Sequence, residues 1–437
     1  MHGFGRGSTR QSLASEGVIR RFHQVGPNRA VNRSNPLRTR RGPRFLLLSL
    51  LLVLTSLDIS GGTGAAFATG TGAGSSGIDC SPLTYPTATD DGALDHLFST
   101  QLGPGWVGGD ATYSTALPGG REAFVFSDTL IGTANAGGSA RINGLAPNSE
   151  LFGPMPHLRS GYGGTFRSPK PLIVDASGHG DEWQVASTYV ENGKQLVFVN
   201  EFAPQNGPFD RFTGRSGIAV LAPRPGGPPL LQSIIGLAGG RRTQWGNAVT
   251  HDGSFTYIYG EVTSAPNGGF SGMKLARAPL GHSLGTRGWQ YWDGSQWEAG
   301  EVHAVVIPTR NELTGVMPQE GHAGYEAVSI PGSEATDTTV DLSYACAPQG
   351  PWSGPIAVYS IPQIKRFHHE LAYIPTFHPE LSPSDAVVVS YNVDTTDGLS
   401  ATRRDVHTYQ PRFLELEDKA PPTSTTTTVL VTNVDRG

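Results

Sequence analysis

Several residue types and motifs are scarce in this chain of 437 residues, and each scarcity argues against a class of protein. Charged residues make up 16% of the sequence and the net charge is −5, so no basic face for nucleic acid is expected. Phosphate-loop and zinc-helix motifs (G-x-x-x-x-G-K-S/T and H-E-x-x-H) are absent. The S-x-D-x-G-x-T-W repeat typical of sialidases is also missing, and no long segment shows helical periodicity.

Long hydrophobic runs are scarce too, with one exception near the N-terminus. Residues 1–44 are rich in arginine with a single acidic residue, Glu16, and an apolar run covers residues 45–57. This run is shorter than the roughly 20 apolar residues of a transmembrane helix. Because Ala66-Phe67-Ala68 fits the rule for signal cleavage, we expect residues 1–68 to be a Sec- or Tat-type export segment cleaved after Ala68. The protein would then be secreted without a membrane association; an uncleaved anchor is the alternative.

Cysteine is limited to two residues, Cys80 and Cys346. In an exported protein we expect them to form a disulfide that ties the N-terminal segment to the folded domain. Two unpaired buried thiols are the alternative. Their spacing matches no metal motif.

Glycine (58) and proline (33) are abundant, and they separate many short apolar runs. Five pairs of runs share one plan, in which a β-rich first strand and a turn precede a second strand that ends on a polar residue. This period predicts an all-β fold, a five-bladed β-propeller over residues 82–417, between a flexible lead-in (69–81) and a disordered Thr/Pro-rich tail (418–437). The predicted first and second strands are 106–120 and 124–132, 181–193 and 197–204, 244–253 and 257–264, 324–333 and 341–348, and 369–382 and 388–395.

In a propeller, first strands start and second strands end at the same face of the central channel. Polar residues at these positions are therefore predicted to meet at one rim, where carboxylates with different pKa values suit acid/base hydrolysis. The catalytic candidates are Asp110, Asp128, Glu326 and Glu370. The substrate-binding candidates are Trp106, Arg167, Asp181, Glu182, Trp245, Asn247, Tyr325, His369, His378 and Asn392.

The carboxylate candidates also have structural alternatives. Asp110 follows Gly108-Gly109, which let the backbone approach a ligand closely, but an Asp there is also an ordinary turn residue. Asp128 ends an apolar strand and could instead cap the following turn. Glu326 interrupts an apolar strand, where an ion pair with an arginine is the alternative. Asp181 and Glu182 could form a simple loop.

The other candidates suit a sugar ligand. Trp106 and Trp245 are predicted to offer flat apolar faces to sugar rings at the polar rim. Arg167 could clamp an anion or a carboxylate. His378 could orient substrate or lie in a turn on the opposite face. The aromatic segment 289–297 is interpreted as an outer hairpin with core side chains.

Residues 105–132, together with 372–381, 387–395 and 347–355, resemble secreted bacterial proteins of the domain-of-unknown-function 4185 family. That family is similar to five-bladed propeller glycoside hydrolases, including arabinanases, and the resemblance covers residues 82–417. It implies endo-action on an arabinan of the mycobacterial cell-wall type. Asp110 and Asp128 match its motifs, whereas the second blade has Asp181-Glu182-Trp183 in place of Trp-Pro-x-Asp-Gly.

The sequence thus predicts a secreted, monomeric glycoside hydrolase acting on a polysaccharide, and the resemblance implies a furanose polymer. Asp110 would be the base or nucleophile, Glu326 or Glu370 the acid, and Asp128 would tune the charge or bind a hydroxyl. No cofactor is expected; a structural Ca²⁺ on the axis would find oxygen ligands, but no loop motif supports it. The alternatives are a non-catalytic carbohydrate-binding propeller and a protein-binding propeller at the cell surface.

Overall fold

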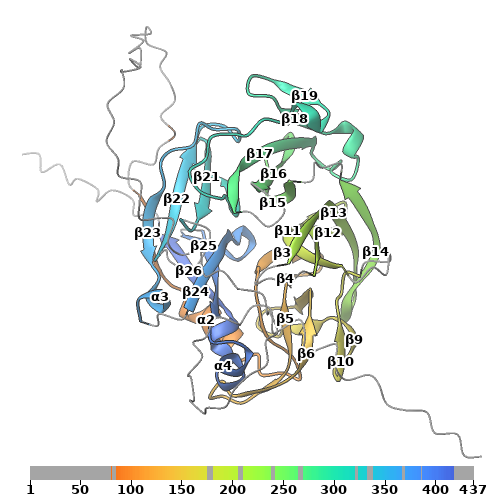
Figure 1. Cartoon of the computed structure of the whole chain (residues 1–437), viewed down its shortest axis with the longest axis vertical. Coiled ribbons are helices and arrows are strands. Elements are labelled where there is room, and N and C mark those ends of the chain that lie inside the picture. The colour runs from red at the N-terminus through yellow and green to blue at the C-terminus, as the bar shows by residue number, and fades with distance from the viewer. Residues whose placement is uncertain are drawn as a thin grey trace, which may run out of the picture. The chain divides into compact units, whose positions relative to one another are not determined.

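The computed structural model describes residue 80 and residues 85–174, 181–204, 210–237, 242–263, 269–319, 323–331, 338–366, 370–384 and 386–417. The predicted export segment, all of the lead-in except Cys80, and the predicted tail lie outside these ranges. Strands dominate the described residues, and most of them belong to five antiparallel sheets, named sheets 1 to 5 in chain order (Figure 1).

The strands of each sheet follow, from its first strand outward. Sheet 1 contains β3 (Tyr113–Leu117), β4 (Arg121–Phe126), β7 (Ser149–Gly153) and β8 (Arg159–Gly161). Sheet 2 contains β11 (Glu182–Glu191), β12 (Lys194–Ala203), β13 (Arg211–Arg224) and β14 (Gly227–Leu237). Sheet 3 contains β15 (Thr243–His251), β16 (Phe255–Thr263), β17 (Phe270–Pro279), β18 (Gln290–Trp292) and β19 (Trp297–Ala299). Sheet 4 contains β20 (Gly315–Pro318), β21 (Tyr325–Ser329), β22 (Thr339–Ala345) and β23 (Ile356–Ser360). Sheet 5 contains β24 (Glu370–Phe377), β25 (Ala386–Thr395), β26 (Pro411–Glu417) and β1 (Thr87–Asp90).

Smaller elements complete the described part. A three-stranded group of β2 (Gly105–Gly109), β5 (Thr129–Ala134) and β6 (Ala140–Ala146) continues the first three strands of sheet 1, and β9 (Gly163–Thr165) pairs with β10 (Ser168–Lys170). The α-helices are α2 (Gly92–Ser99), α3 (Pro362–Arg366) and α4 (Leu399–Arg404). The 3-10 helices are η1 (Thr286–Gly288), η2 (Glu301–His303), η3 (Pro379–Leu381) and η4 (Val406–Tyr409).

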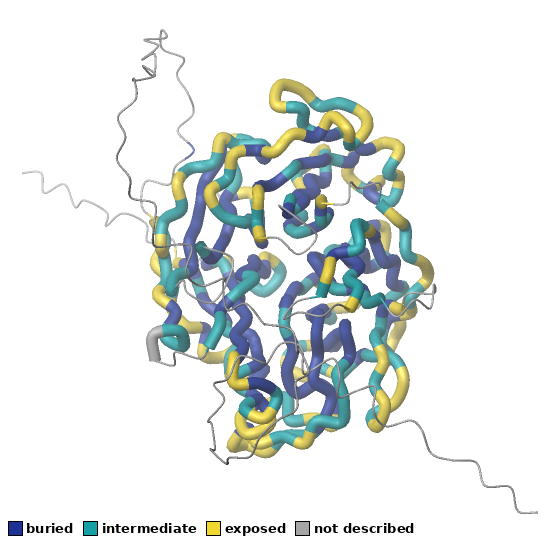
Figure 2. Tube along the Cα trace, in the orientation of Figure 1, coloured by how far each residue is buried: buried dark blue, intermediate teal, exposed yellow. Residues whose placement is uncertain are grey.

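The five sheets pack face to face in cyclic order. Each first strand contacts the next along the series β3, β11, β15, β20 and β24. A separate cluster of buried apolar side chains fills each interface, including the one between sheets 5 and 1. Buried residues accordingly follow the strands, whereas exposed residues concentrate on the connections (Figure 2).

The strand β12 illustrates why these sequences form sheets buried on both faces. Successive side chains of a strand point to opposite faces. Leu196 and Phe198 therefore pack against sheet 3, while Val197 and Val199 pack against sheet 1, and all four are fully buried. This double burial explains the continuous apolar run.

The N-terminal strand closes the series, because β1 pairs with β26 as the outermost strand of sheet 5. The helix α2 follows directly, and Asp91 caps its N-terminus, because the Asp91 carboxylate accepts hydrogen bonds from the amides of Ala93 and Leu94 at 3.0 Å. Its Phe98 packs against Trp106, Phe124 and Phe413 between sheets 5 and 1. Both ends of the domain thus contribute to one interface.

Four of the five predicted strand pairs agree with the structure, and the pair in sheet 4 is wrong. The predicted first and second strands, 324–333 and 341–348, correspond to β21 and β22, which are the second and third strands. The true first strand is β20, which spans only four residues and ends on a proline. A strand this short carries too few alternating positions to stand out in a sequence.

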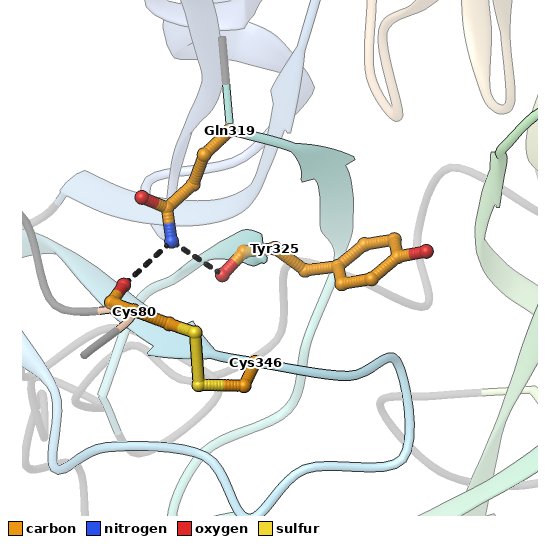
Figure 3. The surroundings of a disulfide bond; sticks show 4 residues. All are labelled: Cys80, Gln319, Tyr325 and Cys346. Atoms are coloured by element: carbon orange, nitrogen blue, oxygen red, sulfur yellow. Dashed lines mark hydrogen bonds between the residues drawn. A yellow bond between two sulfur atoms is a disulfide. The ribbon is translucent and has the colours of Figure 1, made fainter. Parts of the chain in front are cut away.

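Cys80 and Cys346 form the predicted disulfide, with their Cα atoms 5.2 Å apart (Figure 3). The side-chain amide of Gln319 donates to the carbonyls of Cys80 (2.9 Å) and Tyr325 (3.3 Å). The bond therefore holds the segment before β1 against sheet 4, and it is typical of proteins that fold in an oxidising, extracellular environment. None of the helices in the described ranges has the length and apolar character needed to span a bilayer.

Replacing both cysteines by alanine is expected to lower the free energy of unfolding by about 2–5 kcal/mol, because a cross-link across 266 residues restricts the unfolded chain. Guanidinium unfolding under non-reducing conditions measures the loss. Wild-type protein treated with a reductant is the matched control and should lose the same amount. Equal stability of the double variant and the oxidised wild type would contradict this role.

Candidate functional site

The first two strands of sheet 1 are interrupted at the same level, and each interruption carries an aspartate. Asp110 lies between β2 and β3, and Asp128 lies between β4 and β5. The two breaks are joined through the backbone: the amide of Asp110 donates to the carbonyl of Asp128 (3.3 Å), and the amide of Ser127 donates to that of Asp110 (2.9 Å). These backbone hydrogen bonds hold the carboxyl groups of Asp110 and Asp128 close together, although neither residue belongs to a strand.

The two glycines before Asp110 serve packing. A Cβ atom on Gly108 would lie 2.6 Å from the carbonyl oxygen of Tyr409, and one on Gly109 would lie 2.9 Å from the indole nitrogen of Trp106. The backbone is thus approached closely by other parts of the protein at the point where we expected a ligand.

Two tyrosines reach this pair from sheet 5 and from η4. The hydroxyl of Tyr373 donates to Oδ2 of Asp110 at 3.1 Å, and the hydroxyl of Tyr409 donates to the backbone carbonyl of Asp128 at 3.1 Å. Asp394 on β25 adds a third carboxyl group, whose Oδ1 accepts a hydrogen bond from the amide of Thr395 at 2.6 Å. We call Asp110, Asp128, Asp394, Tyr373 and Tyr409 the aspartate cluster.

Burial and mutual repulsion separate the proton affinities of the three carboxyl groups. Burial raises the pKa of Asp110 to about 6, although the hydroxyls of Tyr373 and Tyr409 act in the opposite direction. Burial raises the pKa of Asp394 to about 8, with a further contribution from Asp110. Burial, and then the charge of Asp110, raise the pKa of Asp128 well above its usual range.

This arrangement can supply both an acid and a base near neutral pH. Asp110 is partly exposed and is ionised above about pH 6, whereas Asp394 is 8% exposed and keeps its proton up to about pH 8. Carboxyl groups whose pKa values are pushed apart by their surroundings are typical of acid/base catalysis.

Further carboxylates lie near Tyr113, the first residue of β3. Burial, and then Glu312, Asp110 and Glu261, raise the pKa of the Tyr113 hydroxyl, so these groups lie near one another. The side-chain amide of Asn247 donates to Glu312 and to the carbonyl of Leu313, both at 3.0 Å.

Glu182, the first residue of β11, is close enough to contribute to the raised pKa of Asp128. Of the side chains that the sequence assigns to a common rim, the structure therefore brings together those of Asp110, Asp128 and Glu182. Asn247 lies beside Glu312, which borders the same region through Tyr113. Asp181 is partly exposed and directly precedes β11.

The two predicted sugar-stacking tryptophans are buried, so that assignment is wrong. Trp245 is 0% exposed between sheets 2 and 3, and its indole nitrogen donates to Glu301 at 3.3 Å. Trp106 is 1% exposed and packs against Phe98 and Phe126. Large aromatic rings contribute most to stability when they are removed from water, and both tryptophans are part of the core.

Tyr325 and Glu326 lie at the opposite end of the sheets, and their assignment to the rim is also wrong. The hydroxyl of Tyr325 donates to Asp252 (3.3 Å), in the turn that leads from β15 to β16. Because β21 is a second strand, its beginning lies at the end where first strands finish. Glu326 is buried there and pairs in register with Met317 and Tyr344.

His378 and Asn392 are fully buried and serve the interface between sheets 5 and 1, which corrects their assignment to substrate. His378 contacts Ser114 and shares a hydrogen bond of 2.8 Å with the hydroxyl of Ser390. Burial lowers the pKa of His378 to about 3. Asn392 accepts a hydrogen bond from the Thr112 hydroxyl at 2.7 Å. Ser114 also contacts Glu380, so Asp110, Thr112 and Ser114 form a polar row on alternate residues.

The remaining candidates lie outside the aspartate cluster. Burial raises the pKa of Glu370, while Arg412 lowers it and Asp405 raises it further. The charged neighbours of Glu370 thus differ from those of Asp110. Arg167 is exposed in the turn between β9 and β10. His369 lies outside the described residues.

Sequence reasoning missed Asp394, Tyr373, Tyr409 and Glu312. Asp394 stands two residues after Asn392 and so shares its strand face, a signal that could have identified it. Glu312 precedes β20 and was lost with that strand. Tyr409 comes from a 3-10 helix in a connection, where no periodicity indicates a direction.

In the described part of the chain, no three His, Cys, Asp or Glu side chains are grouped so as to hold a metal ion.

Residues 91–419 match the model of a protein family described as Domain of unknown function (DUF5005). The relation to the 4185 family stays a prediction. No curated protein matches the sequence.

Among solved structures, a protein from Bacteroides ovatus ATCC 8483 described as a "putative hydrolase" is 16% identical, with a TM-score of 0.61 over 75% of this chain and 89% of that one. Xylan β-1,4-xylosidase from Bacillus halodurans C-125 gives 12% identity and a TM-score of 0.41 over 68% of this chain and 50% of that one. A GH43_1 enzyme from Xanthomonas citri gives 13% and 0.41 over 75% and 94%. The first likeness concerns the fold alone.

The raised pKa of Asp394 predicts a pH-dependent cost. A carboxyl whose pKa is raised by folding stabilises the native state less as pH rises from about 4 to about 8. The variant Asp394→Asn should therefore match wild type near pH 4 and exceed it above pH 8, by an amount on the order of a few kcal/mol. Urea unfolding at a series of pH values measures this gap.

The matched control is Asp293→Asn, on the exposed turn between β18 and β19. Hydrogen bonds from the amides of Gln296 and Ser295 lower the pKa of Asp293, so its replacement should give a gap of the opposite sign. A gap for Asp394→Asn that stays constant between pH 4 and 8 would contradict the prediction.

Proposed function

The chain belongs to the family described as Domain of unknown function (DUF5005), and from this premise and the aspartate cluster we propose that it is a secreted glycoside hydrolase with a five-bladed β-propeller fold. The observation that carries the proposal is the gathering of three carboxyl groups with different proton affinities, those of Asp128, Asp394 and the partly exposed Asp110. The cyclic packing of sheets 1 to 5, with β1 closing sheet 5, supports the propeller.

Hydrolysis of a glycoside breaks the bond between the anomeric carbon and the leaving oxygen. The leaving oxygen gains a proton, and water supplies a hydroxyl group to the carbon. We assign the role of base or nucleophile to Asp110, because it is ionised above about pH 6 and is partly exposed. Asp394 takes the role of acid, because it keeps its proton up to about pH 8.

Asp128 would hold a proton or a sugar hydroxyl between these two groups. The acid role passes from Glu326, at the other end of the sheets, to a residue of the aspartate cluster, and Glu370 stays a weaker candidate beside Arg412. The proposed substrate is a polysaccharide, and an arabinan or related furanose polymer cleaved internally is the substrate implied by residues 105–132. In this proposal the enzyme acts as a monomer and needs no cofactor.

The first test is release of reducing sugar from a polysaccharide panel that includes D-arabinan. Wild type should turn over one polymer, and Asp110→Asn should lose activity by about a thousand-fold, because an amide can act neither as base nor as nucleophile. Asp252→Asn is the matched control, since Asp252 also accepts a hydrogen bond from a tyrosine but lies at the opposite end. It should keep near-normal activity.

Three results would contradict parts of this proposal. Equal activity of Asp110→Asn and wild type would remove Asp110 from catalysis. Binding of one polymer without turnover would favour a carbohydrate-binding protein. Neither binding nor turnover on any polymer would favour a protein-binding role.

A further inference from the structure

A residue with a left-handed backbone conformation follows each of the two partners of one hydrogen bond in the aspartate cluster. Within the described residues, the non-glycine residues with positive φ are Ala111 (52°), Asn192 (51°) and Ile374 (46°). Asn192 lies in a turn, where asparagine adopts this conformation readily. Ala111 directly follows Asp110, and Ile374 directly follows Tyr373, the residue whose hydroxyl donates to Asp110. For a β-branched residue such as Ile374 this conformation is a clear outlier.

A β-bulge accompanies the outlier at Ile374. The register of β24 with β25 shifts between Tyr373 and Thr376, so the intervening residues have no regular partner. A bulge bends its strand and re-aims the neighbouring side chains. In β24 the side chain that precedes the bulge is Tyr373, and it points across to sheet 1.

A buried amide holds both bends in place. The side chain of Asn392 donates to the carbonyl of Ile374 at 3.1 Å and accepts from the hydroxyl of Thr112 at 2.7 Å. Thr112 directly follows Ala111, so one fully buried side chain connects the two left-handed positions. An unpaired amide at this depth would be unfavourable, which fixes the geometry once the interface has formed.

Closure of the interface between sheets 5 and 1 does not itself require this strain. The apolar cluster around Phe98, Phe124 and Phe413 already joins the two sheets. What the two bends add is the placement of the Tyr373 hydroxyl 3.1 Å from Oδ2 of Asp110. Backbone strain that surrounding structure maintains is typical of functional sites.

We propose that Tyr373 is a positioning residue, which fixes the orientation of the Asp110 carboxylate, and that Asn392 holds Tyr373 in place. The proposal rests on the catalytic role proposed for Asp110. The hydrogen bond orients Oδ2, while Oδ1 is buried and has no hydrogen-bond partner within the described part of the chain.

The groups that face Asp110 come from every element packed against it. They are Tyr113 on β3, Asp128 between β4 and β5, Tyr373 on β24, Asp394 on β25 and Tyr409 in η4. Burial and the neighbouring carboxylates favour the protonated form of Asp110, whereas the Tyr373 hydroxyl favours the ionised form. Loss of that hydroxyl should therefore raise the pKa.

The test measures the titration of Asp110 in the full protein by NMR of carboxyl-labelled aspartate, with Asp110→Asn identifying the signal. The variant Tyr373→Phe should move the midpoint upward by about one pH unit, since a hydrogen bond to a charged group has that magnitude. Tyr391→Phe is the matched control, because Tyr391 is a buried tyrosine of β25 whose hydroxyl donates to Gln363 (2.9 Å). It should leave the midpoint unchanged.

The titration needs no substrate, so it separates this inference from the proposed function. If a polymer is turned over, the acid limb of kcat against pH should shift upward in Tyr373→Phe with little change in KM. An unchanged midpoint in Tyr373→Phe, or an equal shift in Tyr391→Phe, would overturn the positioning role even if Asp110 is catalytic. A shifted midpoint in a protein without turnover would support the role of Tyr373 and count against the hydrolase.

Discussion

The interface between sheet 5 and sheet 1 is the constraint on which the rest of the structure depends. It joins the first and last described strands through the pairing of β1 with β26, and α2 packs into it. The aspartate cluster lies across the same interface, with Asp110 and Asp128 on one side and Tyr373 and Asp394 on the other. The site therefore exists only when the cycle of sheets is closed.

The interface combines two kinds of contact with different consequences. Its outer part is an apolar cluster, which supplies stability through burial. Its inner part is the polar row of Asp110, Thr112 and Ser114, which meets tyrosine, asparagine and histidine side chains. Buried carboxyl groups with raised pKa values weaken the native state above neutral pH, and the apolar clusters at all five interfaces offset that cost.

Much of the fold followed from the sequence, because strands buried on both faces produce repeated apolar runs separated by glycine and proline. The disulfide followed from the count of two cysteines. The errors in sheet 4 share one cause: β20 is too short to show a period, and its loss moved Glu326 to the wrong end and hid Glu312. Trp106 and Trp245 were misplaced because their local sequence does not distinguish a polar rim from a core.

The candidate site was only partly predictable for a related reason. Asp110 and Asp128 follow motifs within one sheet, where spacing along the chain carries information. The packing of sheet 5 on sheet 1 brings Asp394, Tyr373 and Tyr409 to this pair. The bond between Tyr373 and Asp110, for example, joins residues that are 263 positions apart along the chain. Only the position of Asp394, two residues after Asn392 on β25, gave a local signal for this packing.

The pairing of β1 with β26 has a consequence for how the protein is made. A ribosome produces the N-terminal strand early and its partner close to the end of the domain. Throughout that interval β1 has no partner strand, and Asp110 and Asp128 lack the residues that sheet 5 and η4 bring to the aspartate cluster. Folding of this domain to its final state therefore waits for the synthesis of β26, and a nascent chain that ends before β24 lacks the assembled site.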